Sequence, residues 1–342
     1  MSIVSEITRI NNNISAAYSA CQDKNAELPL TQKSANLANT IRSITASNFT
    51  EIQEKDVNFY DYDGTLVYSY TFAEVAELTE LPEIPIHTNL VANKWTDTLS
   101  NIKSEALLGN PSDIGALYNT VDGSTYLYLT ANDSSLLNNI NLNFSIKQGT
   151  LSIMIDNTVL DSYTTSGTGA EDYSALINLP TSQSYPANYI IKLSFSASGN
   201  SGKYNLGGSS INGFFCYDDS KKRAILKKIY LGSNCFLQTG NAFSNHYGLE
   251  AITLNETFGN INGNTFRYCT SLKAIIIPDS VTSIGANSFQ YCYSLKVAIL
   301  PKGNSITIGI SMFQYTDIKR IIFPKYSSFQ TASSAFANCP RL

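Results

Sequence analysis

The sequence predicts a multidomain α+β protein: N-terminal helices, a small α+β unit, an all-β sandwich and a C-terminal solenoid with a parallel sheet. Its 342 residues exceed what one compact core usually organises, so two to four units are expected. Apolar residues recur with a helical period at the start, and alternate along short runs in the middle. Towards the end they repeat at a long fixed period, which is typical of stacked coils.

Residues 1–45 read as two helices. The first carries a heptad seam with spacings of 4, 3, 4, 3 and 4, made by Ile3, Ile7, Ile10, Ile14, Ala17 and Cys21. Isoleucine at both seam positions favours three or four strands, so a homotrimer through residues 3–21 is one predicted assembly. Pro29 ends this helix, and Ser34 caps a second. The alternative is a helical hairpin packed on itself or on its neighbour.

Residues 55–104 form a small unit that opens with a β-hairpin. Asp63-Gly64 is a strong hairpin-turn signal, and Leu66–Tyr70 returns as the second strand. A short helix over Phe72–Leu78 follows, and then a stretch bounded by prolines. Trp95 is expected to anchor the unit by burying its ring.

Residues 113–200 predict an all-β sandwich, because short alternating runs recur at roughly ten-residue spacing. The predicted strands are 124–130, 139–146, 151–155, 159–163 and 189–196. The serine- and glycine-rich stretch Ser196–Ser210 reads as a linker to the next unit.

Residues 222–342 repeat themselves. Five aliphatic residues stand 23 apart, by 249−226, 272−249, 295−272 and 318−295: Leu226, Leu249, Leu272, Leu295 and Ile318. Five phenylalanines keep step, with one inserted residue before the fourth: Phe243, Phe266, Phe289, Phe313 and Phe336. With the shared pattern L-x-x-I-x-I-P, this period indicates five coils of a leucine-rich repeat solenoid, each burying its apolar residues against the next.

The segment Leu272–Cys292 resembles the BspA-type leucine-rich repeat, L-x-x-I-x-I-P-x-x-V-x-x-I-G-x-x-A-F-x-x-C. Its cysteine is replaced around His246 in the first coil and near Thr316 in the fourth. The resemblance implies a surface-exposed or secreted bacterial protein that binds other proteins, without catalysis.

Two weaker resemblances concern the rest of the chain. Residues 1–45 and 57–95 are similar to tail-associated proteins of phages and prophages of gut Firmicutes. Residues 113–198 resemble a polycystic-kidney-disease-type (Ig-like) domain, with Asp156-Asn157 in place of its W-G-D-G turn.

A candidate binding face follows from the solenoid pattern. Strand positions that point away from the core are expected to be exposed, and they combine cations with apolar residues, as a partner surface does. The candidate face is Lys273, Ile276, Lys296, Ile299, Lys319 and Ile322, flanked by Ala274, Val297 and Arg320. An ordinary solvated sheet is the alternative. A second candidate is glycan stacking on the tyrosines of the sandwich: Tyr126, Tyr128, Tyr163, Tyr173, Tyr185 and Tyr189.

One motif suggests catalysis. Asp61-Tyr62-Asp63-Gly64-Thr65 matches the D-x-D-G-T signature of haloacid-dehalogenase-type phosphotransferases, which need Mg²⁺ and a buried, continuously apolar parallel strand before the first aspartate. Asn58 interrupts that strand, and an antiparallel return follows at once, so the hairpin turn is favoured. Two histidines in the chain leave little for a His-based metal site or triad. No cofactor is predicted, and the chain is expected not to be an enzyme.

Three cysteines share one column of the repeats: Cys269, Cys292 and Cys339. A Cys269–Cys292 disulfide is geometrically conceivable, but buried free thiols are favoured, because free cysteine packs as a small apolar residue.

Composition sets the context. Charged residues make up 15% against roughly 25% in typical soluble chains, and tyrosine alone counts 21, as in secreted, cell-surface and virion proteins. A net charge of −4 offers no basic field for nucleic acid, and no apolar run approaches the roughly 20 residues that span a bilayer. No secretory signal is visible, since Asn11–Asn13 stand where an apolar core belongs.

The sequence therefore predicts a non-enzymatic recognition or adhesion protein, extracellular or at the cell surface. It would bind a protein or glycan at a bacterial or host surface through the repeat face and the sandwich. The alternative is a phage or prophage tail component in a virion, assembled through the N-terminal helices. A third is a Mg²⁺-dependent phosphatase that uses Asp61 and Asp63.

Overall fold

The chain divides into two compact units, Met1–Gln53 and Glu54–Leu342. The computed structural model describes residues 52–131, 139–179, 187–207, 225–237, 240–302, 306–323, 328–329 and 334–342. The helices predicted for residues 1–45, and with them the homotrimer contact, lie outside the described residues. No helix within the described ranges is long and apolar enough to cross a membrane.

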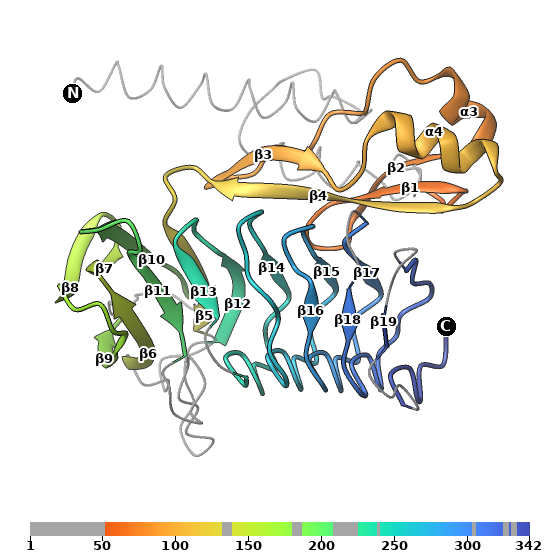
Figure 1. The fold of residues 1–342 in the computed structure, drawn as a ribbon. Coiled ribbons are helices and arrows are strands. Elements are labelled where there is room, and N and C mark those ends of the chain that lie inside the picture. The colour runs from red at the N-terminus through yellow and green to blue at the C-terminus, as the bar shows by residue number, and fades with distance from the viewer. Residues whose placement is uncertain are drawn as a thin grey trace, which may run out of the picture. The chain divides into compact units, whose positions relative to one another are not determined.

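A four-stranded sheet with two helices opens the described chain, and we call residues 54–120 the α+β domain. The sheet order is β2-β1-β4-β3, in which β1 and β4 are parallel and the two outer strands are antiparallel to their neighbours. Both helices lie on one face of this sheet (Figure 1). The elements are β1 (Val57–Tyr60), β2 (Leu66–Tyr70), α3 (Phe72–Glu77), β3 (Leu90–Trp95), α4 (Leu99–Leu107) and β4 (Ser112–Thr120).

Local chemistry explains the start of this domain, where the predicted hairpin, helix and tryptophan anchor are confirmed. Gly64 turns the hairpin with a φ of 85°, a conformation that glycine adopts without cost. Thr71 caps α3 because its side chain accepts the Glu74 backbone N–H. In return, the Glu74 carboxylate accepts the Thr71 backbone N–H. The buried Trp95 ring packs on Phe59, and its Nε1 donates to the Pro82 carbonyl at 2.7 Å.

Strand β4 lies in a different sheet from the one that the sequence predicted. We expected residues from 113 onward to belong to the sandwich, but β4 pairs with β1 and β3 and completes the first sheet. The sequence runs on through further strands without a composition break, so its pattern gives no sign of the change of sheet.

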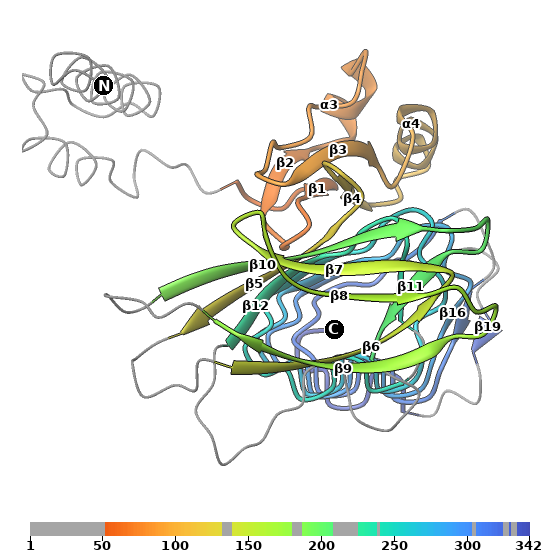
Figure 2. The same ribbon diagram turned by 90° about the vertical axis from the view of Figure 1, so that its left-hand side faces the viewer.

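Two further sheets pack on a common core. The first has the order β14-β12-β5-β10-β7-β8, and the second β13-β11-β6-β9. Figure 2 shows them facing each other, with the coils behind. Tyr204 crosses between the sheets and donates to Thr125 at 2.6 Å. The strands are β5 (Thr125–Ala131), β6 (Asn139–Lys147), β7 (Gly149–Ile155), β8 (Thr158–Thr165), β9 (Glu171–Asn178), β10 (Ala187–Ala197), β11 (Lys203–Leu206), β12 (Ile225–Tyr230), β13 (Cys235–Leu237) and β14 (Ala251–Thr253).

The five strands predicted in this region are confirmed as β5, β6, β7, β8 and β10. The linker predicted at Ser196–Ser210 is wrong, because it contains β11, which pairs with β6 on one side and with β13 on the other. No separate boundary divides this region from the repeats, since β12 and β14 extend one sheet and β13 extends the other.

The repeats stack as parallel coils. Each coil adds to two rows of short parallel strands, seen side by side in Figure 1. One row runs from β12 and β14 to β15 and β17, and the other contains β16, β18 and β19. The new elements are β15 (Ala274–Ile276), β16 (Ser283–Ile284), β17 (Val297–Ile299), β18 (Thr307–Ile308) and β19 (Ser328–Phe329).

The 23-residue period places equivalent side chains of successive coils on top of one another in the core. The rings of Phe243, Phe266, Phe289 and Phe313 are buried and stack with centroids 5.7, 5.3 and 5.4 Å apart. These separations are slightly larger than the roughly 4.8 Å spacing of paired strands, and each coil buries the phenylalanine ring of its neighbour. The aliphatic column beside it, from Leu226 to Ile318, is buried as well.

Candidate functional site

The strand face of the repeats, predicted to be exposed, is largely covered by the chain itself. Ile276 and Ile299 are 4% and 3% exposed and pack with Tyr60 and Leu117 of the α+β domain. Ala274 is also fully buried. The expectation that these residues face solvent is wrong, because the periodicity marks a side chain as outward without showing what packs on it.

The remaining candidate residues are more open. Lys273 and Lys319 have side chains 58% and 43% exposed, Lys296 is exposed, and Ile322 is partly buried. The predicted face is therefore split, with its central isoleucines in an internal interface and its lysines at the edge. These lysines lie where rim cations of a protein interface would lie.

Two glycines let the α+β domain approach this closely. A Cβ atom at Gly115 on β4 would stand 2.6 Å from Cγ2 of Ile276, well inside van der Waals contact. At the hairpin turn, a Cβ atom on Gly64 would stand 2.9 Å from the Ala274 Cβ. At both positions the glycine backbone of the α+β domain lies directly against a side chain of the repeats. The two parts therefore form a packed interface.

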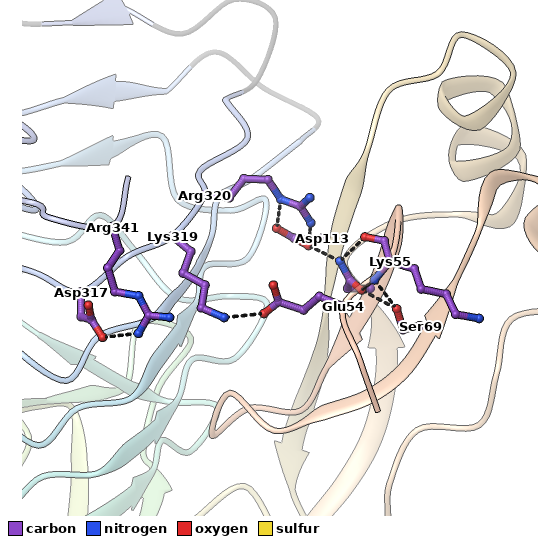
Figure 3. A network of polar contacts seen from close by, with 9 residues as sticks. Glu54, Lys55, Ser69, Asp113, Asp317, Lys319, Arg320 and Arg341 are labelled. Atoms are coloured by element: carbon purple, nitrogen blue, oxygen red, sulfur yellow. Dashed lines mark hydrogen bonds and ion pairs between the residues drawn. The ribbon is translucent and has the colours of Figure 1, made fainter. Parts of the chain in front are cut away.

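Ion pairs surround the apolar centre of the interface. Arg320 binds the Asp113 carboxylate through Nε, at 2.8 Å, and through a second nitrogen (Figure 3). This hydrogen bonding raises the pKa of Arg320 above its ordinary value, against the opposing effect of desolvation. Lys319 lies 3.4 Å from Glu54 in the same view. A third pair joins Lys302 to the nearly buried Asp97 at 2.8 Å.

Asp61, the proposed nucleophile of the phosphatase alternative, is a buried acceptor. Its Oδ1 accepts from the Tyr118 hydroxyl at 2.8 Å, and its Oδ2 lies 2.7 Å from Nε2 of His87. Burial first, and then the Asp61 charge, raise the pKa of Tyr118 well above its ordinary value. Beside them the Tyr62 and Tyr230 hydroxyls lie 2.7 Å apart and join the domain to β12.

Asp63 has a different position from Asp61. Its Oδ1 accepts the Thr65 backbone N–H at 3.0 Å, as turn aspartates do. Across the described ranges, no group of three His, Cys, Asp or Glu side chains is arranged to hold a metal ion. The two aspartates thus share a hairpin turn and have separate structural partners.

The tyrosines proposed for glycan stacking are mostly committed to the fold. Tyr126 is 6% exposed and donates to Asp122 at 3.0 Å. Tyr163 and Tyr173 pack on Phe144 and donate to Asp161 and Glu171. Tyr185 lies outside the described residues. Tyr126, Tyr163 and Tyr173 pack and donate within the fold, and glycan stacking on the tyrosines of the sandwich stays a prediction.

The cysteine column consists of free thiols, as favoured from the sequence. The thiols of Cys269, Cys292 and Cys339 each donate to the phenylalanine carbonyl of the preceding coil, at 3.1, 3.1 and 3.0 Å. Thr316 takes the same column in the fourth coil, and its hydroxyl donates to the Phe313 carbonyl at 2.8 Å. Thr316 therefore donates within its own coil, whereas the three cysteines donate to the coil before theirs.

The largest groove described on this side lies between α4 and the fifth coil. Its volume is ≈ 820 Å³, and its apolar lining is Leu108, Pro111, Ile321, Ile322 and Phe323. Leu108, at the end of α4, is 73% exposed. Among the described strands, β17 is the last of its row, and the fifth coil that follows contributes Ile321, Ile322 and Phe323 to the groove. The groove therefore continues the outward isoleucine column beyond the part that the α+β domain covers.

The repeats are similar to known leucine-rich repeat sequences. Residues 219–342 match the BspA-type leucine-rich repeat region with six copies, where the spacing predicts five coils. No curated protein matches the chain. A crystal structure of a leucine-rich repeat protein from Bacteroides ovatus is similar at 23% identity and a TM-score of 0.36. That match covers 44% of this chain and 38% of the other, well under two thirds of its length.

Proposed function

We propose that this chain is a non-enzymatic, surface-associated recognition protein whose repeat region binds a protein partner. The family resemblance supports a protein-binding repeat exposed at a bacterial surface. The groove between α4 and the fifth coil is the proposed contact.

One observation carries this proposal. Ile276, Ile299 and Ile322 occupy one outward column of successive coils, and Tyr60 and Leu117 cover the first two. Ile322 instead lines the groove, together with the exposed Leu108. The chain's own domain shows that this column packs well against a protein surface. A partner that places an apolar side chain between Leu108 and Ile322 would extend that packing.

The polar rim of the groove fits the same reading. Lys302 with Asp97, and Arg320 with Asp113, fix charged side chains at its border through ion pairs within the chain. A border of neutralised pairs around an apolar floor is the arrangement of protein interfaces, where charge is depleted at the centre.

Binding to defined surface proteins tests the proposal. The full chain is passed over an array of purified extracellular-matrix proteins, bacterial surface proteins and neutral glycans, and hits are quantified by surface plasmon resonance. Ile322→Glu and Leu108→Glu should each weaken a protein hit at least tenfold, because each places a charge on the apolar floor. Ile86→Glu is the matched control, since Ile86 is 94% exposed and does not line the groove.

Two results would contradict the proposal. One is a protein hit that Ile86→Glu weakens as much as Ile322→Glu does. The other is an array on which glycans bind and no protein does.

A further inference from the structure

A second pocket lies on the outer face of the sheet β13-β11-β6-β9, away from the α+β domain. Its volume is ≈ 480 Å³, inside the roughly 300–1,000 Å³ of small-ligand sites. Lys147 and Lys203 line it from the strands, and Phe236 lines it from β13. Thr168 and Asn260 complete the wall from two loops.

The two lysines face each other across the strand pair, and no carboxylate of the described residues lines the pocket. Lys203 and Lys147 are direct partners in the antiparallel pairing of β11 with β6, and like charges in that position repel. Within the described part of the chain neither ammonium group forms an ion pair, and no aspartate or glutamate lines the pocket. On the neighbouring strand, Glu171 accepts from Thr165 and Tyr173. Asp172 is exposed opposite Ser145 and does not line the pocket.

A third donor is fixed at the pocket wall. The Oδ1 atom of Asn260 accepts from the Thr282 backbone N–H, the Thr282 hydroxyl and the Ser283 backbone N–H, at 3.0, 3.1 and 3.0 Å. These three bonds hold the carboxamide in place and leave its Nδ2 group as the donor. Lys203 also lies over the Phe236 ring, with its Nζ 5.2 Å from the centroid, which restricts where that ammonium can point.

We propose that this pocket binds an acidic saccharide through its carboxylate. Two ammonium groups and an amide N–H₂ supply charge-assisted hydrogen bonds to an anion and relieve the repulsion across the strands. The pocket volume accommodates one or two sugar rings, and its amide and hydroxyl lining suits sugar hydroxyls. The site lies on a different face from the protein-binding groove and does not depend on that proposed function.

Calorimetric titration of the full chain with a uronic-acid disaccharide tests the proposal, with the neutral disaccharide of the same linkage as the comparison. The acidic sugar should bind at least tenfold more tightly than the neutral one, and its affinity should fall as salt is added. Lys147→Gln, Lys203→Gln and Asn260→Asp should each weaken it at least tenfold. Lys94→Gln, at a lysine whose side chain is 52% exposed outside the pocket, should leave it unchanged.

Thermal unfolding separates binding from folding. Lys203→Gln should keep or raise the unfolding temperature of the unliganded chain, because it removes a like-charge contact; a marked fall would make the pair structural and overturn the site. Equal binding of the neutral sugar, or an undiminished affinity in Lys147→Gln, would also overturn it. Tighter binding of a hexaglutamate peptide than of the sugar would assign the pocket to acidic peptides and refute the saccharide class.

Discussion

Arg320 of the fifth coil binds the carboxylate of Asp113 on β4, 207 positions earlier in the chain, through two of its nitrogen atoms. Asn58 donates to the same carboxylate at 3.2 Å. Asp113 is thereby held from its own sheet and from the repeats at once. This pair fixes the edge of the interface that covers the outward isoleucines.

Removing one partner of this pair should destabilise the chain. We expect Asp113→Ala to cost about 1–3 kcal/mol of unfolding free energy, because it leaves a half-buried guanidinium without its acceptor. A double-mutant cycle with Arg320→Ala, measured by denaturant unfolding, should give a coupling energy of about 1 kcal/mol. Strictly additive single changes would show that the pair contributes nothing to docking.

The glycine at the interface gives a second prediction. Gly115→Ala should destabilise the chain by about 1–3 kcal/mol, since the new methyl group overlaps the Ile276 side chain. Ile276→Ala removes the overlapping atoms, so the double variant should lose less than the sum of the two single losses. Gly109→Ala is the comparison for placing alanine at a glycine with open space around it, although its φ of 72° carries its own backbone cost. If Gly115→Ala lowers the unfolding free energy as much in the Ile276→Ala background as in the wild type, the two residues do not pack closely.

His246 should make stability depend on pH. Complete burial lowers its pKa from 6.5 to about 4, so between these values the unfolded chain binds a proton that the folded chain does not. Stability is therefore full above pH 6.5 and falls as the pH drops towards 4, by up to about 3 kcal/mol. Unfolding curves across this range check it. His246→Cys, which places the column's usual residue there, should flatten this part of the profile, whereas an unchanged slope would assign it to other groups.

Thiol reactivity should follow burial. Burial raises the pKa of Cys235 to about 12 and that of Cys269 well above its ordinary value, so thiolates are scarce at pH 8. Cys339 is partly exposed. Alkylation of the folded chain, followed by peptide mass mapping, should modify Cys339 at least tenfold faster than Cys235, Cys269 and Cys292. Equal rates in all four would mean that the coils open readily.

The sequence predicts an element correctly where the pattern of apolar residues within a single segment is enough to define it. The repeat ladder, the Asp63-Gly64 hairpin and strands such as β6 follow from spacing and alternation, because one face of each is buried. Strand β11 was missed, since its four residues lie in a serine- and glycine-rich stretch and become a strand through pairing with β6 and β13.

The site was harder to predict than the fold. An outward position in a repeat is visible in the sequence, but the sequence does not show that Tyr60 and Leu117 pack on Ile276 and Ile299. Gly64 and Gly115 are local traces of that contact, but Gly64 reads as a hairpin turn, and Gly115 lies in a stretch that the sequence assigned to another unit. The groove and the lysine pocket both depend on such distant neighbours.

The continuity of the two sheets from the antiparallel strands into the coils bears on how the repeats arise. A first coil that had to nucleate alone would fix its backbone before any neighbour could bury its core. Here β5 and β11 belong to the two antiparallel sheets, and their edges pair with β12 and β13, the first strands of the repeats. Because the register of each coil is set by the strand beside it, a change in the number of coils far from β5 and β11 should leave the antiparallel strands intact.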